Sequence, residues 1–181
     1  MVHTKRLVTG KPGVGKTTCV EKIVRMLPTS RVVGFLTREV REQGARVGFQ
    51  IEIIGNGTVP LARKHHRSPY RVGRYGVYVE NVDFTVTELK AREKQLNQSP
   101  RIYVIDEIGK MEAYSARFRE WVEAVLSSEW PVVATIALKG TPWIERLKQW
   151  SGIEILLLTE ENRNTVCQHL RQQIHDIFSA I

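Results

Sequence analysis

The feature that most constrains this chain of 181 residues is a glycine-rich segment close to its start. Residues 10–17 read Gly-Lys-Pro-Gly-Val-Gly-Lys-Thr, which fits the pattern G-x-x-x-x-G-K-[S/T] at every position. A short apolar segment, residues 6–9, precedes it, and apolar residues at helical spacing follow it as far as Pro28. A strand, a glycine loop and a helix in this order predict a phosphate-binding loop, or P-loop.

The residue types of this loop suit a polyphosphate ligand. Glycines let the backbone fold closely around phosphate oxygens, and the helix expected from Lys16 adds the positive end of its dipole. We expect Lys16 to contact the β- and γ-phosphates, the Thr17 hydroxyl to contact Mg²⁺, and Thr18 to donate to the α-phosphate. The predicted nucleotide-binding residues are Gly10, Lys11, Pro12, Gly13, Val14, Gly15, Lys16, Thr17 and Thr18.

A second signal is the segment Ile-Tyr-Val-Ile-Asp-Glu at residues 102–107. The apolar run is typical of a buried strand in a parallel sheet, and ligands bind at the carboxyl end of such strands. We expect Asp106 to hold the Mg²⁺ through water, so the predicted metal-site residues are Thr17 and Asp106. The predicted catalytic residues are Glu107, which would orient or deprotonate the attacking water, and Lys16. A role for Glu107 as a cap of the following loop stays open.

Recognition of a base and stabilisation of the transition state would both need residues other than this acidic pair. Asp106 and Gly109 also fit the D-x-x-G pattern of GTPases, but the chain has no N-K-x-D element to read guanine. Hydrolysis further needs a cation for the charge that develops on the transferring phosphoryl group. The candidates are Arg38, Arg41, Lys110, Arg117 and Arg119, each of which could instead be a plain surface residue.

Strand and helix patterns alternate along most of the chain, which predicts a three-layer α/β sandwich on a mostly parallel sheet. A turn at Gln43-Gly44 between alternating segments predicts an antiparallel hairpin, and Asp83 is expected to cap a helix. The strands are expected at residues 6–9, 31–37, 47–53, 75–79, 101–106, 131–138 and 153–158. The helices are expected at residues 16–27, 83–96, 114–125, 141–150 and 166–178.

Composition narrows the class of protein. No linker or repeat divides the chain, so residues 1–181 are expected to form a single domain. There is no run of 18 apolar residues, and no secretory signal is expected after Met1, so the predicted location is the cytoplasm, with no membrane partner.

Cys19 and Cys167 are predicted to be reduced core thiols. The net charge is +8, with a basic cluster at residues 63–74 that is either a solvated loop or lies near phosphate.

The chain resembles the cancer-related nucleoside-triphosphatase family of thermophilic prokaryotes and animals. The resemblance spans nearly the whole chain and is weakest at residues 64–70. It implies a RecA-like P-loop fold with Glu107 at the catalytic acid/base position, and slow Mg²⁺-dependent hydrolysis of NTP to NDP and phosphate with loose base selectivity. The segments that carry it are residues 10–17, 34–41, 46–49, 60–62, 72–77, 106–112, 133–136 and 158–163.

The preferred interpretation is therefore a nucleoside-triphosphate phosphohydrolase that accepts ATP, GTP, CTP and UTP. The sequence does not determine its oligomeric state, although a monomer is favoured. A nucleoside or nucleotide kinase stays open, because the basic cluster at residues 63–74 would suit an arginine-rich lid over an acceptor. A nucleic-acid-associated ATPase is a further alternative, suggested by the net charge and the pI ≈ 9.7. The sequence contains no recognised motif for RNA or DNA, so a nucleic-acid partner is not expected.

Overall fold

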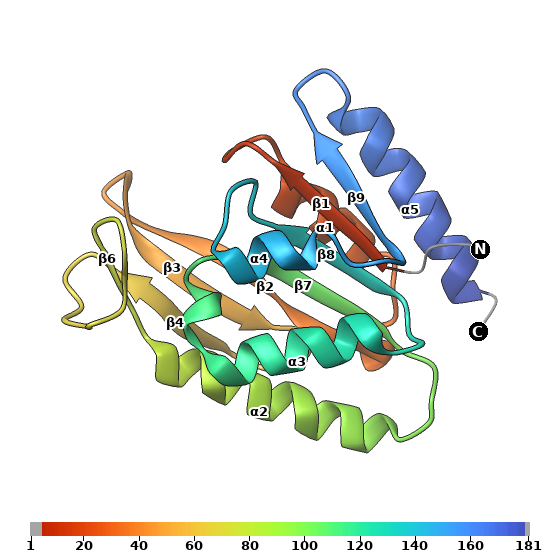
Figure 1. The fold of residues 1–181 in the computed structure, drawn as a ribbon, viewed down its shortest axis with the longest axis horizontal. Coiled ribbons are helices and arrows are strands. Elements are labelled where there is room, and N and C mark those ends of the chain that lie inside the picture. The colour runs from red at the N-terminus through yellow and green to blue at the C-terminus, as the bar shows by residue number, and fades with distance from the viewer. Residues whose placement is uncertain (1–4, 180–181) are drawn as a thin grey trace.

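The computed structural model describes residues 5–179, and it arranges them as a nine-stranded sheet with helices on both faces (Figure 1). The strands are β1 (Lys5–Gly10), β2 (Val32–Glu42), β3 (Ala45–Ile53), β4 (Thr58–Arg63), β5 (Arg71–Val72), β6 (Tyr75–Val77), β7 (Ile102–Ile108), β8 (Val132–Ile136) and β9 (Ile153–Leu158). The helices are α1 (Lys16–Val24), α2 (Val79–Leu96), α3 (Ala116–Ser127), α4 (Pro142–Leu147) and α5 (Arg163–Ser179), with short 3₁₀ turns η1 (Thr29–Arg31) and η2 (Glu112–Tyr114).

One half of the sheet is parallel and follows the predicted α/β pattern. In the strand order β5-β6-β4-β3-β2-β7-β8-β1-β9, all neighbours from β2 to β9 run parallel. Their apolar runs are buried because helices cover both faces of the sheet. Strand β8 lies between β1, which leads into the glycine loop, and β7, which ends near Asp106. The predicted three-layer fold is confirmed.

The other half of the sheet is antiparallel and larger than the predicted hairpin. The turn at Gln43 and Gly44 joins β2 to β3 as expected, and β4, β6 and β5 continue the sheet. Strand β4 was not predicted, because Pro60 interrupts its pattern and proline lowers the expectation of a strand. Pairing of β2 with β7 ends at Leu36, but β2 continues to Glu42. The β2–β3 hairpin therefore projects beyond the parallel strands (Figure 1).

The helices divide into two layers with separate cores. Helices α2, α3 and α4 cover one face of the sheet, where Leu89, Trp121 and Ile144 are fully buried. Helices α1 and α5 cover the other face, where Ile23 and Leu170 are buried. Within residues 5–179, no helix is both long enough and apolar enough to cross a bilayer. Residues 1–4, where the absence of a secretory signal was predicted, lie outside the described residues.

The start of α2 differs from the prediction. The helix begins at Val79, one turn before Asp83, so Asp83 does not cap it. The Asp83 carboxylate instead accepts a hydrogen bond from the Ser115 hydroxyl, and Ser115 accepts one from the amide of Phe118 at 2.9 Å. Ser115 is thus the N-cap of α3, and Asp83 links the two helices that share this face.

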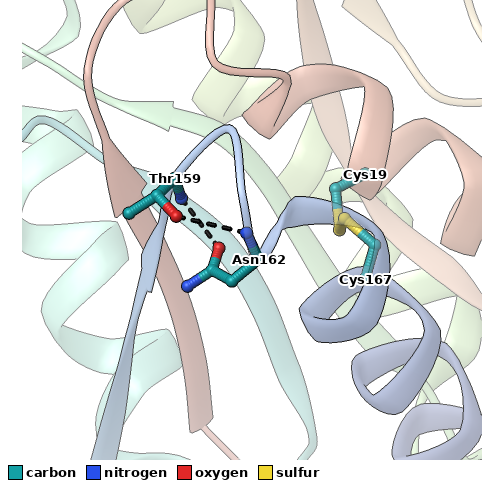
Figure 2. The surroundings of a disulfide bond; sticks show 4 residues. All are labelled: Cys19, Thr159, Asn162 and Cys167. Atoms are coloured by element: carbon teal, nitrogen blue, oxygen red, sulfur yellow. Dashed lines mark hydrogen bonds between the residues drawn. A yellow bond between two sulfur atoms is a disulfide. The ribbon is translucent and has the colours of Figure 1, made fainter.

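The prediction of two reduced thiols is wrong for this structure. Cys19 on α1 and Cys167 on α5 form a disulfide, with their Cα atoms 5.5 Å apart (Figure 2). Both residues lie on apolar helix positions as expected, but the two helices pack side by side, which brings these positions into contact. Sequence spacing gave no sign of this, because 148 positions separate the two residues.

Just before α5, a short turn orders the chain that leads into this helix. The Thr159 amide donates to Asn162 Oδ1 at 2.8 Å, and the Asn162 amide donates to Thr159 Oγ1 at 3.2 Å (Figure 2). Reciprocal bonds of this kind satisfy amides that a helix start leaves free. The disulfide joins α1, which begins at the glycine loop, to α5, whose start is held by these two hydrogen bonds.

Reducing the disulfide should lower the melting temperature. Because the bond closes a very long loop, its loss should cost roughly 2–4 kcal/mol of unfolding free energy, or about 5–15 °C for a chain of this size. Thermal melting followed by circular dichroism, with and without dithiothreitol, measures the shift. The Cys19→Ala/Cys167→Ala double variant is the control and should melt at one temperature in both buffers. Equal melting of the wild type in both would show that the bond does not stabilise the fold.

Candidate functional site

The glycine loop lies between the end of β1 and the start of α1, as the sequence predicts. Gly13 and Gly15 have φ angles of 79° and 107°, a region that residues with a Cβ rarely adopt. Gly15 is also the N-cap of α1 and provides no side-chain cap. The first amides of α1 therefore have no side-chain cap, and free amides at a helix start are suited to bind an anion.

Lys16 and Thr17 extend from the loop toward neighbouring groups. The Lys16 amine donates to the carbonyl oxygens of Gly10 at 3.0 Å and Lys11 at 3.3 Å, so it lies across the mouth of the loop. The Thr17 hydroxyl donates to Asp106 Oδ1 at 3.2 Å. Thr18 is exposed one position further along α1. The loop and the end of β7 thus meet directly, although β8 separates β1 from β7 in the sheet.

Asp106 is the most tightly held polar residue of the site. Its side chain is 1 % exposed, and it accepts hydrogen bonds from Thr135 Oγ1 at 2.6 Å and from Thr17 Oγ1. The Thr37 amide donates to Oδ2 at 3.4 Å, and the Thr37 hydroxyl donates to the Asp106 backbone oxygen at 2.6 Å. Burial raises the pKa of Asp106, while these hydrogen bonds and the charge of Lys16 act in the opposite direction.

Thr37 and Thr135 are site residues that the sequence reasoning missed. Each lies on a strand that neighbours β7: Thr37 is the first residue of β2 after its last pair with β7, and Thr135 is near the carboxyl end of β8. The signal was present, because the carboxyl ends of neighbouring parallel strands meet at one edge of the sheet. A polar residue inside an otherwise apolar strand, such as Thr135 in Val-Val-Ala-Thr-Ile, is the pattern that identifies such a position.

Glu107 has a second carboxyl group beside it, from Glu112. A Cβ placed on Gly109 would lie 3.1 Å from Glu107 Oε1 and 2.7 Å from Glu112 Oε2, so the two carboxyls flank this glycine. Burial raises the pKa of Glu107, and the Lys16 charge opposes the shift. Burial, with the nearby Glu107 charge, raises the pKa of Glu112 to about 8. Glu112 is only 3 % exposed and was not predicted as a site residue.

A cavity of ≈ 960 Å³ is lined by Asp106, Glu107 and most of the glycine loop. Lys11 and Val14 are not among its lining residues, since Val14 packs into the core below the loop and Lys11 faces solvent. The remaining predicted residues all line it, namely Gly10, Pro12, Gly13, Gly15, Lys16, Thr17, Thr18, Asp106 and Glu107. The structure therefore brings together nearly all of the residues that the two sequence motifs selected.

The candidate cations divide into those inside and those outside the cavity. Arg38 and Lys110 line it, and Arg38 forms ion pairs with Glu21 and Glu52. Three others are not among its lining residues: Arg41 pairs with Glu39, Arg119 donates to the Ala113 carbonyl, and Arg117 is exposed.

The basic cluster at residues 63–74 reaches this cavity only through its apolar and glycine residues, Val72 and Gly73. Arg71 donates to the carbonyl oxygens of His66 and Arg74 and so orders its own loop. Arg63 donates to the Phe49 carbonyl. Among residues 5–179, none of the cluster's cationic side chains lines this cavity, so an arginine-rich lid over the phosphates is not present in this arrangement.

The donor set fits a hard divalent cation. The Thr17 hydroxyl and the Asp106 carboxylate are oxygen donors 3.2 Å apart, and oxygen donors supplemented by phosphate oxygens and water are what Mg²⁺ prefers. Within the described part of the chain, no group of three or more His, Cys, Asp or Glu residues is placed to bind a metal by itself. A metal at Thr17 and Asp106 would accordingly depend on ligands that a nucleotide supplies.

Comparison with known proteins identifies close relatives. A family described as NTPase matches residues 5–171. A nucleoside-triphosphatase THEP1 of Thermotoga sp. (strain RQ2) is 42% identical over 166 residues, 92% of each chain. The cancer-related nucleoside-triphosphatase homolog of Mus musculus is 34% identical over 171 residues, 88% of this chain and 90% of that protein.

Two solved structures are similar over the same range. The crystal structure of THEP1 from Aquifex aeolicus has a TM-score of 0.82 at 34% identity and covers 92% of this chain and 96% of its own. The solution structure of a human cancer-related nucleoside triphosphatase has a TM-score of 0.72 at 31% identity, with 95% and 97% covered.

Glu112→Gln should remove a pH dependence of stability in the metal-free protein. Because the pKa of Glu112 is raised to about 8 in the folded chain, its contribution to stability is complete below the unfolded pKa of about 4.3 and is lost as pH rises toward 8. The variant should thus become increasingly more stable than the wild type from pH 5 to pH 8, and the difference in unfolding free energy should reach an order of a few kcal/mol. Urea denaturation in EDTA at several pH values measures it. A constant difference would contradict the expectation.

Proposed function

The chain belongs to the NTPase family, and from this membership and the geometry of the site we propose that it hydrolyses nucleoside triphosphates to diphosphates and phosphate with Mg²⁺. The observation that carries the proposal is the contact between Thr17 and Asp106, with Lys16 and Glu107 beside it. Thr17, Asp106, Lys16 and Glu107 all line one cavity, which supports their assignment as a metal-binding pair, a phosphate-binding cation and a carboxylate base. This is the set of groups that P-loop hydrolysis needs.

In the proposed mechanism, the free amides at the start of α1 and the Lys16 amine bind the β- and γ-phosphates. Thr17 and Asp106 would hold Mg²⁺, which would supply positive charge to stabilise the phosphate oxygens. Thr37 and Thr135 keep the Asp106 carboxylate in one orientation through their hydrogen bonds. Because these groups are fixed before the substrate arrives, little reorganisation is needed in the transition state.

Glu107 is the proposed general base. It lines the cavity, and its raised pKa makes it a better proton acceptor than an exposed carboxylate. It accepts the proton of the water that attacks the γ-phosphorus, and the bond from this phosphorus to the β–γ bridging oxygen breaks. Of the candidate cations chosen from the sequence, Lys110 and Arg38 line the cavity and are proposed to stabilise the charge on the leaving oxygens; Lys139 lines it too. Lys110 is the better candidate, since Arg38 is already paired with two carboxylates.

Further parts of the proposal concern substrate range and organisation. Loose base selectivity, with ATP, GTP, CTP and UTP all accepted, is supported by the absence of a base-reading motif in the sequence. A single domain over residues 1–181 is supported by the one continuous sheet that the described residues form. The cytoplasmic location and the monomeric state stay predictions from the sequence.

Glu107→Gln should retain nucleotide binding and lose most turnover, by roughly 10²–10⁴-fold, because the amide keeps the shape of the side chain but accepts no proton. Lys16→Ala should instead lose productive phosphate binding. Phosphate release from ATP, GTP, CTP and UTP with Mg²⁺ and no acceptor measures turnover, and fluorescence of a labelled nucleotide measures binding. Glu120→Gln, an exposed glutamate on α3, is the matched control and should turn over like the wild type.

Normal turnover of Glu107→Gln would show that another group is the base. Phosphate release from one nucleotide alone would contradict the loose base selectivity but leave the hydrolase intact. Nucleotide binding with no phosphate release from the wild type would overturn the proposed function itself.

A further inference from the structure

The segment that leads from β9 into α5 lies directly against the glycine loop. A Cβ placed on Gly15 would lie 4.0 Å from Cδ of Arg163, which is the first residue of α5. A Cβ placed on Gly10 would lie 2.5 Å from the carbonyl oxygen of Leu158, the last residue of β9. The two ends of this segment therefore meet the two ends of the glycine loop.

Helix spacing explains why Arg163 is held at this place. Cys19 follows Gly15 by four residues, so the two positions are one turn apart on one face of α1. Cys167 follows Arg163 by four residues and is likewise one turn further along α5. The disulfide between the two cysteines thus fixes the facing sides of the two helices one turn beyond the contact between Arg163 and Gly15 (Figure 2).

The backbone at Arg163 is fixed, whereas its guanidinium has no partner. The Arg163 amide donates to the Thr159 carbonyl at 3.0 Å, and Asn162 Nδ2 donates to the Leu157 carbonyl at 3.0 Å. These bonds add to the reciprocal pair between Thr159 and Asn162 (Figure 2). The Arg163 residue is exposed, and among residues 5–179 its side chain forms no hydrogen bond or ion pair. A cation on an ordered backbone is therefore left available for a ligand.

The direction of the triphosphate brings the nucleoside to this arginine. In the proposed function, Lys16 binds the β- and γ-phosphates, and the α-phosphate lies at Thr18. Thr18 is exposed and follows Gly15 by three residues, so the two positions are neighbours on the surface of α1. The nucleoside is attached to the α-phosphate and so begins beside the Arg163 side chain.

The charges near Arg163 favour a base over a phosphate as its partner. Glu160 and Glu161 are exposed in the same segment, so residues 159–163 carry two negative charges and one positive charge. This balance weakens the attraction for an anion. A planar guanidinium also stacks on the rings of bases, and it does so on purines and pyrimidines alike because every base has a π-face.

We propose that Arg163 stacks on the base of the bound nucleoside triphosphate and is the residue that holds the base without reading its edge. The inference rests on the proposed function, since the direction of the triphosphate comes from it, and it gives the loose base selectivity a physical cause. Stacking contributes affinity to every nucleotide and distinguishes little between them. The disulfide and the turn at Thr159 and Asn162 serve to place this side chain.

The test is a set of dissociation constants in which either the guanidinium or the base is removed. ATP, GTP, CTP, UTP and ribose 5-triphosphate, which has no base, compete with a fluorescent nucleotide for the wild type and Arg163→Ala in Mg²⁺. The variant should bind all four nucleotides about five- to tenfold more weakly, as expected for the loss of one cation–π contact. Ribose 5-triphosphate should bind both proteins equally. At saturating nucleotide, kcat should change by less than about twofold, because the base contact is the same in the ground and transition states.

Two further variants separate stacking from charge and from a general effect on α5. Arg163→Lys keeps the charge but loses the planar group, so it should bind nucleotides as weakly as Arg163→Ala. It also serves in place of Arg163→Ala should that variant melt below the assay temperature. Arg171→Ala removes an exposed arginine about two turns further along α5 and should bind like the wild type.

Other outcomes would overturn the inference, each in a distinct way. Equal weakening of ribose 5-triphosphate would show that Arg163 contacts phosphate or ribose, and wild-type affinity in Arg163→Lys would show that only its charge matters. Weaker binding of one nucleotide alone would mean that Arg163 reads a base edge, and unchanged binding of all four would remove it from the site. Normal binding without phosphate release from the wild type would overturn the proposed hydrolysis and leave the base contact standing, because the constants are measured without turnover.

Discussion

The site depends on one buried carboxylate and the hydroxyl groups around it. Asp106 is almost fully removed from solvent, which would favour its neutral form if it had no polar neighbours. Hydrogen bonds from Thr17, Thr37 and Thr135 compensate for the lost water. These donors come from α1, β2 and β8, so satisfying one carboxylate fixes the relative positions of the loop helix and two strands. A shift in any of these elements would remove one of the three donors from a buried carboxylate.

Lys16 connects this carboxylate to the rest of the cavity. Its charge lowers the pKa of both Asp106 and Glu107, against the effect of burial. Among the described residues, the lysine amine donates hydrogen bonds only to carbonyl oxygens of its own loop, at Gly10 and Lys11. It is thereby held near two acidic groups without forming a close ion pair with either, and it keeps donor capacity for a phosphate. A direct salt bridge in this position would compete with the ligand.

Much of the fold and of the site could be predicted from the sequence, and the reasons are local. The glycine loop and the run into Asp106 are contiguous segments whose pattern determines their conformation. The residues that were missed depend on contacts between distant segments. Thr37 and Thr135 belong to the site only because β2 and β8 flank β7, and Cys19 meets Cys167 only because α1 packs on α5. Strand order and helix packing are not encoded at short range, so no spacing rule reveals them.

The length of β2 connects the two ends of the cavity. This strand pairs with β7 as far as Leu36, next to Asp106, and then continues for six residues with β3 as its partner. Side chains alternate along a strand, so Thr37, which binds Asp106, and Glu39, which binds Arg46, point to the same side. One strand thus sets the distance between Asp106 and the Glu39–Arg46 pair, which both line the cavity. A hairpin that ended at the edge of the parallel strands would leave this side of the cavity without the Glu39, Arg46 and Phe49 side chains that line it.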